Sequence, residues 1–299
     1  MKNLTMLLLI VMVACGSPER PGQTTFSTPE DAVVAMVDAA RAGNKAELMA
    51  IFGPEGEKIL SSGDPVMDQN AVQTFIAAYD ERAQLSEEDG KRILMVGNEE
   101  WPFAIPLIKD GAKWRFDAEA GADEVFYRRI GHNELNTIEA CRTYVAAQQE
   151  YAKKAHDGIK AGAYAQRFPS TPGKQDGLYW EAKASEDPSP LGDLIAKAAA
   201  LGYHGSGDKP MPFYGYYFRI LTAQGKNAEA GARDYLKQGE MRGGFALIAV
   251  PAEYGNSGIM TFMVNQDGVV FQKDLGADTT KTAAEISAFD PDPTWTRVQ

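Results

Sequence analysis

A long amphipathic helix pattern followed by strand-like segments constrains the fold of this chain more than any other feature. In HNELNTIEACRTYVAAQQEYAKKAHDG, apolar or small residues recur near one helical face and most charged residues point elsewhere. We expect this helix to begin after Gly131 and to end at Gly158, since glycine is typical of helix boundaries. The positions predicted to face the core are Leu135, Ile138, Cys141, Val145, Gln148 and Ala152.

The segments after this helix predict strands. YGYYFRILTAQG, GGFALIAVPAEYG and GIMTFMVNQDGVVFQKDLG are rich in aromatic and β-branched residues. Asp267-Gly268 separates two such runs, which is a strong hairpin signal. We therefore expect residues 125–299 to form a C-terminal α+β domain in which the long helix packs on an antiparallel sheet.

Residues 26–124 predict a smaller α+β domain. Ser27 or Thr28 before Pro29 is a typical helix start, and further helical patterns cover 45–52 and 70–82. KRILMVGNEEWPFAIPLIKDGAKWRFD then shows short apolar runs separated by turn residues, which predicts an antiparallel sheet. Helices followed by such a sheet resemble small exported domains of the cystatin and NTF2-like type.

The N-terminus predicts export. MKNLTMLLLIVMVAC has one positive charge followed by an apolar run too short to span a bilayer, so residues 1–14 are interpreted as a signal peptide. The end of this segment resembles a bacterial lipobox with Cys15 as the lipidated residue, and residues 15–25 predict a flexible tether. Gly16 after the cysteine favours the outer membrane. The alternative is an ordinary cleaved signal in which Cys15 has no role.

Composition and charge restrict the partners and the means of stabilisation. The formal net charge of −11 argues against nucleic acid, because phosphate binding requires clustered Lys and Arg. A membrane contact would therefore depend on the lipid anchor. If Cys15 is lipidated, Cys141 remains without a disulfide partner and the fold must depend on its core. A hydrophobic fraction of 44% permits such a core.

Several segments together resemble the DUF2950 family of bacterial exported proteins. The resemblance is carried by LSSGDPVMD, EEWPFAIPLI, WRFDAEAG, RRIGHNEL, AQQEYA, QDGLYW, GYYFRILTAQG, GGFALIAVPAEYGNSGIMTFMVNQDGVVFQKDLG and FDPDPTW, and it covers residues 26–295. It implies an envelope location and no established activity. Residues 132–276 also resemble, more weakly, the globular part of type IV pilin-like proteins, although no apolar membrane span precedes the helix.

RRIGHNE, residues 128–134, gathers more reactive side-chain types than any other stretch, yet its spacing argues against catalysis. His132 and Cys141 would lie about 180° apart on a helix, so they could not form a nucleophile and base pair. We interpret Cys141 as a small buried hydrophobe and His132 or Asn133 as a helix N-cap. Arg128 and Arg129 would then pair with acids such as Asp117 or Asp123. The alternative is a ligand or substrate site.

Other motifs for chemistry are incomplete. Ser257 in YGNSGI lacks the second glycine of a nucleophile elbow, and RGGFAL lacks the spacing of a phosphate-binding loop. Three scattered histidines show no zinc spacing. Asn265 and Asp267 could bind calcium, but a hairpin turn explains them better. We expect no catalytic residue, no metal and no cofactor.

Aromatic residues of the C-terminal half are the remaining candidates for binding. Tyr and Trp interleaved with glycine can form a recognition surface for a glycan or a protein, or they can simply belong to the sheet core. The sequence therefore favours a lipid-anchored envelope protein acting as a binding or assembly module. The alternatives are an envelope hydrolase that acts on cell-wall material at a site near Arg129, His132 and Trp180, and a pilin-like subunit of a secretion or surface complex. The candidate binding residues are Arg129, His132, Tyr179, Trp180, Tyr214, Tyr216 and Tyr254.

Overall fold

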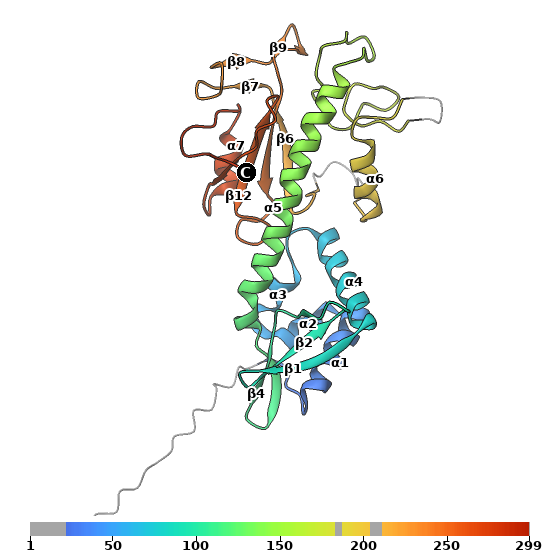
Figure 1. Ribbon diagram of the computed structural model, residues 1–299, viewed down its shortest axis with the longest axis vertical. Coiled ribbons are helices and arrows are strands. Elements are labelled where there is room, and N and C mark those ends of the chain that lie inside the picture. The colour runs from blue at the N-terminus through green and yellow to red at the C-terminus, as the bar shows by residue number, and fades with distance from the viewer. Residues whose placement is uncertain (1–21, 183–186, 204–210, 299) are drawn as a thin grey trace, which may run out of the picture. The chain divides into compact units, whose positions relative to one another are not determined.

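The structure is a computed structural model that describes residues 22–182, 187–203 and 211–298. The predicted signal peptide 1–14, Cys15 and most of the predicted tether 15–25 lie outside the described residues. No helix among the described residues has the length and apolar character needed to cross a membrane. The described chain contains both helices and antiparallel sheets, and this combination confirms the predicted α+β class (Figure 1).

Contacts divide the described chain into two compact units. Unit 1 contains the described residues up to Gly56 together with Ile76–Gly121. Unit 2 contains Glu57–Phe75 and the described residues from Ala122 onwards. The segment Glu57–Phe75 was expected in the N-terminal domain, but its residues Asp64 and Asn70 hydrogen-bond to three residues of unit 2, namely Leu201, Tyr203 and Gly215.

Unit 1 contains helices and a small antiparallel sheet. Helix α1 is Pro29–Arg41, and Thr28 caps it by accepting a hydrogen bond from the Asp31 amide, as the sequence predicts. Helix α2 is Lys45–Phe52. The strands are β1 (Ala83–Glu88), β2 (Lys91–Val96), β3 (Trp101–Pro102), β4 (Leu107–Asp110) and β5 (Lys113–Phe116), paired in the order β1-β2-β4-β5 with β3 on β2. Phe116 is fully buried and packs edge-on against Phe52, with ring centroids 5.5 Å apart.

Short helical segments link the first helices to the sheet of unit 1. A 3-10 turn, η1, covers Gly53–Glu55, and α3 covers Gly56–Leu60. Helix α4 is longer and covers Pro65–Glu81. Asp64, directly before α4, accepts hydrogen bonds from the amides of Val66 and Met67 and so caps this helix.

The centre of unit 2 is a five-stranded antiparallel sheet with the strand order β14-β13-β12-β11-β6. These strands are β6 (Tyr216–Leu221), β11 (Ala246–Pro251), β12 (Met260–Asn265), β13 (Phe271–Asp274) and β14 (Thr296–Arg297). The predicted hairpin is confirmed: β12 pairs with β13, and the Gly268 amide donates to the Asn265 carbonyl at the turn. Two small ribbons accompany the sheet, β7 (Ala223–Gln224) with β8 (Arg233–Asp234) and β9 (Leu236–Lys237) with β10 (Glu240–Met241).

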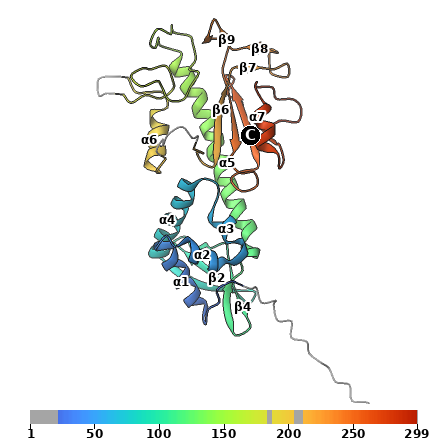
Figure 2. The same cartoon turned by 180° about the vertical axis from the view of Figure 1, so that it is seen from behind.

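Helices lie on both faces of this sheet (Figures 1 and 2). Helix α5, Ala118–Tyr151, packs on one face, where the Tyr144 ring lies 5.6 Å from the Phe245 ring and its hydroxyl donates to the Ala246 carbonyl. Helix α7, Thr279–Glu285, lies on the opposite face. Arg219 of β6 donates to the carbonyls of Ala283 and Ile286, which secures the end of α7 to the sheet. Unit 2 also contains the nine-residue helix α6 (Gly192–Ala200).

Helix α5 differs from its predicted form. It begins at Ala118 rather than after Gly131, so neither His132 nor Asn133 is its N-cap, and that prediction is wrong. Residues such as Ala, Glu and Arg upstream of Gly131 favour a helix enough to carry it through the glycine. Leu135, predicted to be buried, is 70% exposed, because the buried stripe runs instead through Asn133, Thr137, Cys141, Tyr144 and Gln148.

Gly131→Ala tests the continuity of α5. A methyl group at this position would meet no heavy atom within 4 Å, and alanine costs less conformational entropy than glycine in a helix. We expect the substitution to increase the free energy of unfolding by about 0.5–1 kcal/mol, measured by urea unfolding. Gly121→Ala in the same helix is the matched control and should destabilise, because its methyl carbon would lie 2.7 Å from the Ala104 carbonyl oxygen. Destabilisation by Gly131→Ala would contradict a continuous helix.

Candidate functional site

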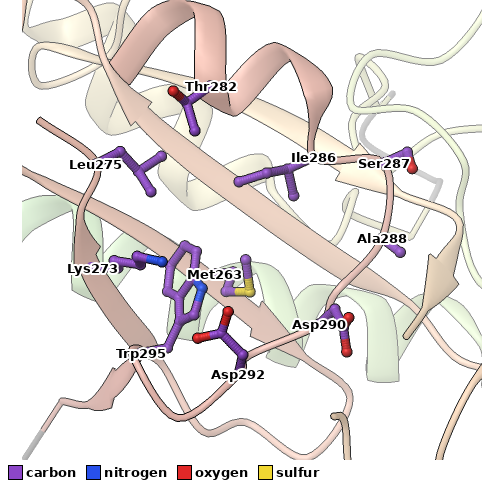
Figure 3. Close-up of a pocket in the computed structure, with 10 residues that line it drawn as sticks. All are labelled: Met263, Lys273, Leu275, Thr282, Ile286, Ser287, Ala288, Asp290, Asp292 and Trp295. Atoms are coloured by element: carbon purple, nitrogen blue, oxygen red, sulfur yellow. The ribbon is translucent and has the colours of Figure 1, made fainter. Parts of the chain in front are cut away.

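A pocket of about 350 Å³ opens on the α7 face of the unit 2 sheet (Figure 3). Its walls come from β12, β13, α7 and the segment that follows α7, which carries FDPDPTW at 289–295. Half of the lining side chains are apolar and half are polar or charged. The lining residues are Met263, Lys273, Leu275, Thr282, Ile286, Ser287, Ala288, Asp290, Asp292 and Trp295.

The strand register determines which side chains form the floor of this pocket. Met263 lies opposite Phe271, and Thr261 lies opposite Lys273, so Met263 and Lys273 point to the same face of the sheet. Phe271 in turn lies opposite Arg297, which brings Trp295 of the last segment alongside Lys273. The Lys273 ammonium lies 5.9 Å from the centroid of the Trp295 ring. Met263 and Trp295 are both buried, so they form a fixed floor.

The segment after α7 positions two carboxylates at the pocket. The Phe289 amide donates to the Ala223 carbonyl, and the Gly225 amide donates to the Phe289 carbonyl, which ties this segment to β7. Asp290 follows directly, and its Oδ1 accepts a 2.7 Å hydrogen bond from the Asn227 amide. Asp290 packs so closely on Gly225 that a methyl carbon there would lie 2.2 Å from its Cγ.

Asp292 is held by a local turn. Its Oδ1 accepts hydrogen bonds from the amide and the hydroxyl of Thr294. These two hydrogen bonds lower the pKa of Asp292 below its usual value, and the nearby Lys273 ammonium lowers it further. Asp292 is therefore ionised at neutral pH, which suits a binding group and does not suit a general acid.

The motif RRIGHNE is not part of this pocket, and its arginines have other partners than those predicted. Arg128 pairs with Glu124 at 2.6 Å, one helical turn away, rather than with Asp117 or Asp123. Arg129 donates to the carbonyls of Ile59 and Lys58 at 2.5 and 3.2 Å and to the Asn256 side chain. Its burial lowers its pKa, and Asp68 and Glu253 partly offset this. Arg129 thus joins the 58–61 segment to the 253–258 loop.

The remaining polar residues of the motif also bind backbone. Oε1 of Glu134 accepts hydrogen bonds from the amides of Ile259 and Met260 at 3.0 and 2.9 Å. The Asn133 side chain donates to the Ser257 carbonyl at 2.9 Å. His132 is exposed, contacts Asn136 one turn further along, and lies edge-on to the Tyr214 ring with centroids 6.1 Å apart. These contacts support the structural interpretation of the motif over a ligand site.

Cys141 and Ser257 are inaccessible as nucleophiles. Cys141 is fully buried, and burial raises the pKa of its thiol to about 12, so it remains protonated at neutral pH. The Ser257 hydroxyl is also fully buried, where it donates to the Glu253 carbonyl and accepts from the Glu253 amide. Within the described residues, no group of three or more His, Cys, Asp or Glu side chains could hold a metal ion.

Asn265 and Asp267 of the predicted hairpin form hydrogen bonds with each other. The Asn265 side-chain amide donates to Oδ2 of Asp267 at 2.8 Å, and its carbonyl oxygen accepts from the Asp267 amide at 3.2 Å. Gly268 has a φ of +76°, a conformation that the turn requires and glycine adopts freely. The hairpin turn thus accounts for the residues considered for calcium.

The aromatic candidates lie mainly in the core. Trp180, Tyr214 and Tyr216 are buried, whereas Tyr179 and Tyr254 are half-buried. Tyr216 donates to the Met260 carbonyl, and Tyr254 donates to Asp274. These residues do not form one flat exposed surface, because a sheet strand such as β6 turns alternate side chains into the core.

Trp180 and His132 also lie at different parts of unit 2. The Trp180 ring contacts His156, which stacks on Tyr151 at the end of α5 with centroids 4.0 Å apart. His132 precedes Tyr151 by 19 residues on a straight stretch of helix, which corresponds to about 28 Å. The structure therefore does not bring Arg129, His132 and Trp180 into one site.

The pocket residues were not predicted from the sequence. FDPDPTW was identified only as a segment that carries the family resemblance, and Lys273 only as a residue of a predicted strand. The sequence does carry a signal, because this segment places two aspartates and a tryptophan within six residues, and charged and aromatic side chains are common in binding sites. What the sequence did not reveal is that this segment returns to the face of the sheet that holds Met263 and Lys273.

One comparison with known proteins gives a match. A family model described as "Protein of unknown function (DUF2950)" matches residues 23–298. No curated protein and no solved structure matches the chain. The resemblance to type IV pilin-like domains therefore stays a prediction, although a long helix on an antiparallel sheet is present in unit 2.

Proposed function

The chain belongs to the DUF2950 family, and we propose that it is a non-catalytic binding module of the cell envelope that holds a small ligand in the unit 2 pocket. The pocket combines an apolar floor with a few charged groups, which is the usual composition of a ligand site. Export and an acyl anchor at Cys15 are part of the proposal, and they rest on the N-terminal sequence alone.

The positions of the reactive side chains favour binding over hydrolysis. A hydrolase needs a nucleophile, a base and a site for the developing charge close together. His132, Glu134 and Ser257 are engaged with side-chain or backbone partners, and Cys141 is sealed in the core. The pocket offers only hydroxyls, one amine and carboxylates, of which Asp292 has a lowered pKa. The lining of the pocket is the single observation that carries the proposal.

A pocket-filling substitution tests this proposal. Ala288 lines the pocket, so phenylalanine there should occupy the volume that the ligand needs. We expect the wild type to retain a small molecule from an envelope extract, detected by mass spectrometry after denaturation, and Ala288→Phe to retain at least tenfold less. Ala284→Phe, on the exposed side of α7 and outside the lining, is the matched control and should behave as the wild type.

The same experiment separates binding from the alternative activity. Recovery of an unaltered compound supports the binding module. Recovery of a cleaved product that the wild type generates and Ala288→Phe does not would contradict it and indicate a hydrolase. Equal retention by the wild type and Ala288→Phe would also contradict the proposal, because the pocket would then be irrelevant to binding.

A further inference from the structure

We infer that the unit 2 pocket takes an organic ammonium ion that carries an aliphatic chain. This inference rests on the proposed function, since it names the ligand class for the same pocket. Three features of the pocket carry it: an excess carboxylate, an apolar floor, and a pre-positioned acceptor oxygen.

The charges around the pocket do not cancel. Its lining contains one cation, Lys273, and two carboxylates, Asp290 and Asp292. The Lys273 ammonium lies near enough to Asp292 to lower the pKa of that carboxyl, so these two charges attract each other. Asp290 forms no salt bridge with any residue that the structure describes, so one negative charge remains without a counter-ion. A cationic ligand would neutralise the pocket, whereas an anion would meet two carboxylates.

The floor selects for hydrocarbon beside that charge. Five apolar residues line the cavity, and Figure 3 shows Met263 beside Trp295; the other three are Leu275, Ile286 and Ala288. A sugar ring carries a hydroxyl on most of its carbons, and these groups would lose water against Met263 and Leu275 without gaining partners. An aliphatic chain gains from burial on the same surface. The Lys273 ammonium already lies over the Trp295 indole, so this ring offers the ligand apolar surface.

The Asp290 carboxylate is held in place at the edge of the pocket. Its Oδ1 is fixed by the Asn227 amide, and the absence of a side chain at Gly225 gives the carboxylate its room. Oδ2 of Asp290 has no hydrogen-bond donor among the described residues, so it can accept from a ligand. A group held in place before binding loses little conformational freedom when the ligand arrives.

Binding of n-pentylammonium, measured by isothermal titration calorimetry on the full mature chain, tests the inference. We expect it to bind at least tenfold more tightly than 1-pentanol or pentanoate, which have the same chain length without the positive charge. Asp290→Asn should weaken pentylammonium binding about tenfold or more. Gly225→Ala should do the same without removing the charge, because its methyl carbon displaces the carboxylate. Glu285→Gln, exposed on α7 outside the pocket, is the control and should change affinity less than about twofold.

Two sources share this chemistry, a free amine and a lysine side chain of a peptide. Nα-acetyl-lysine methylamide distinguishes them: its binding indicates a peptide, and binding of pentylammonium alone indicates a free amine, both within the inference. Equal or tighter binding of pentanol or pentanoate would overturn it. If neither ammonium probe binds while Ala288→Phe still abolishes ligand retention, the ammonium inference fails and the proposed binding function stands. If Ala288→Phe has no effect, both fail.

Discussion

Asp64→Ala should lower the free energy of unfolding of unit 2 by about 3 kcal/mol or more. Asp64 is fully buried, and its two oxygens accept four hydrogen bonds. Oδ1 accepts from the amides of Val66 and Met67 at the start of α4. Oδ2 accepts from the Tyr203 hydroxyl at 2.7 Å and the Gly215 amide at 2.9 Å. Alanine would leave these four donors without their acceptor, and one of them, the Gly215 amide, lies in the interior.

The measurement must report on unit 2 alone, because a chain with two units need not unfold in one step. Hydrogen exchange of α5 amides in increasing urea provides this. Asp68→Ala is the matched control: among the described residues this neighbouring carboxylate accepts hydrogen bonds only from the Ser62 amide and attracts the half-buried Arg129, so its loss should cost about 1 kcal/mol. Equal effects of the two substitutions would show that the four contacts of Asp64 contribute little.

Asp64 also illustrates what the sequence can and cannot reveal. An aspartate before a proline at the start of a helical pattern is a local capping signal, readable from adjacent residues. Its other partners, Tyr203 and Gly215, are 139 and 151 residues away. No local pattern encodes a contact at that separation. The same limit explains why the segment Glu57–Phe75 belongs to unit 2, which the sequence pattern did not indicate.

Elements with strong local signals were predicted well. The Asp267-Gly268 hairpin, the Thr28 cap and the α+β class all follow from turn chemistry and periodicity. The start of α5 was not predicted correctly, because a single glycine such as Gly131 costs only about 1 kcal/mol in a helix that its neighbours otherwise stabilise. The pocket was not predicted either, since Met263, Lys273 and Asp290 meet only through sheet register and the return of the last segment.

Gly258→Ala should also destabilise unit 2 strongly, by about 3 kcal/mol. A methyl carbon at this position would lie 2.0 Å from the hydroxyl oxygen of Tyr216 and 2.5 Å from the ring carbon that bears it. Tyr216 cannot easily move away: it is fully buried, its hydroxyl donates to the Met260 carbonyl, and its ring packs against Phe262. Glycine in GNSGI is thus required by the tyrosine beneath it and not by a catalytic turn.

Combining the substitution with a smaller residue at position 216 tests the cause. Tyr216→Leu removes the hydroxyl and the ring, so Gly258→Ala in that background should cost less than about 1 kcal/mol, and the two changes should be strongly non-additive. Gly255→Ala is the control in the same loop: no heavy atom lies within 4 Å of its added methyl, and only its φ of +76° opposes the change. The readout is again hydrogen exchange of α5 amides in urea. An unchanged cost of Gly258→Ala in the Tyr216→Leu background would show that something other than the tyrosine excludes a side chain there.

Because Glu134 of RRIGHNE binds the amides that follow Gly258, a displaced Tyr216 should also weaken the attachment of this loop to α5. That coupling gives the reactive-looking motif a physical role: it fixes the loop and strand β12, whose residue Met263 forms the floor of the pocket.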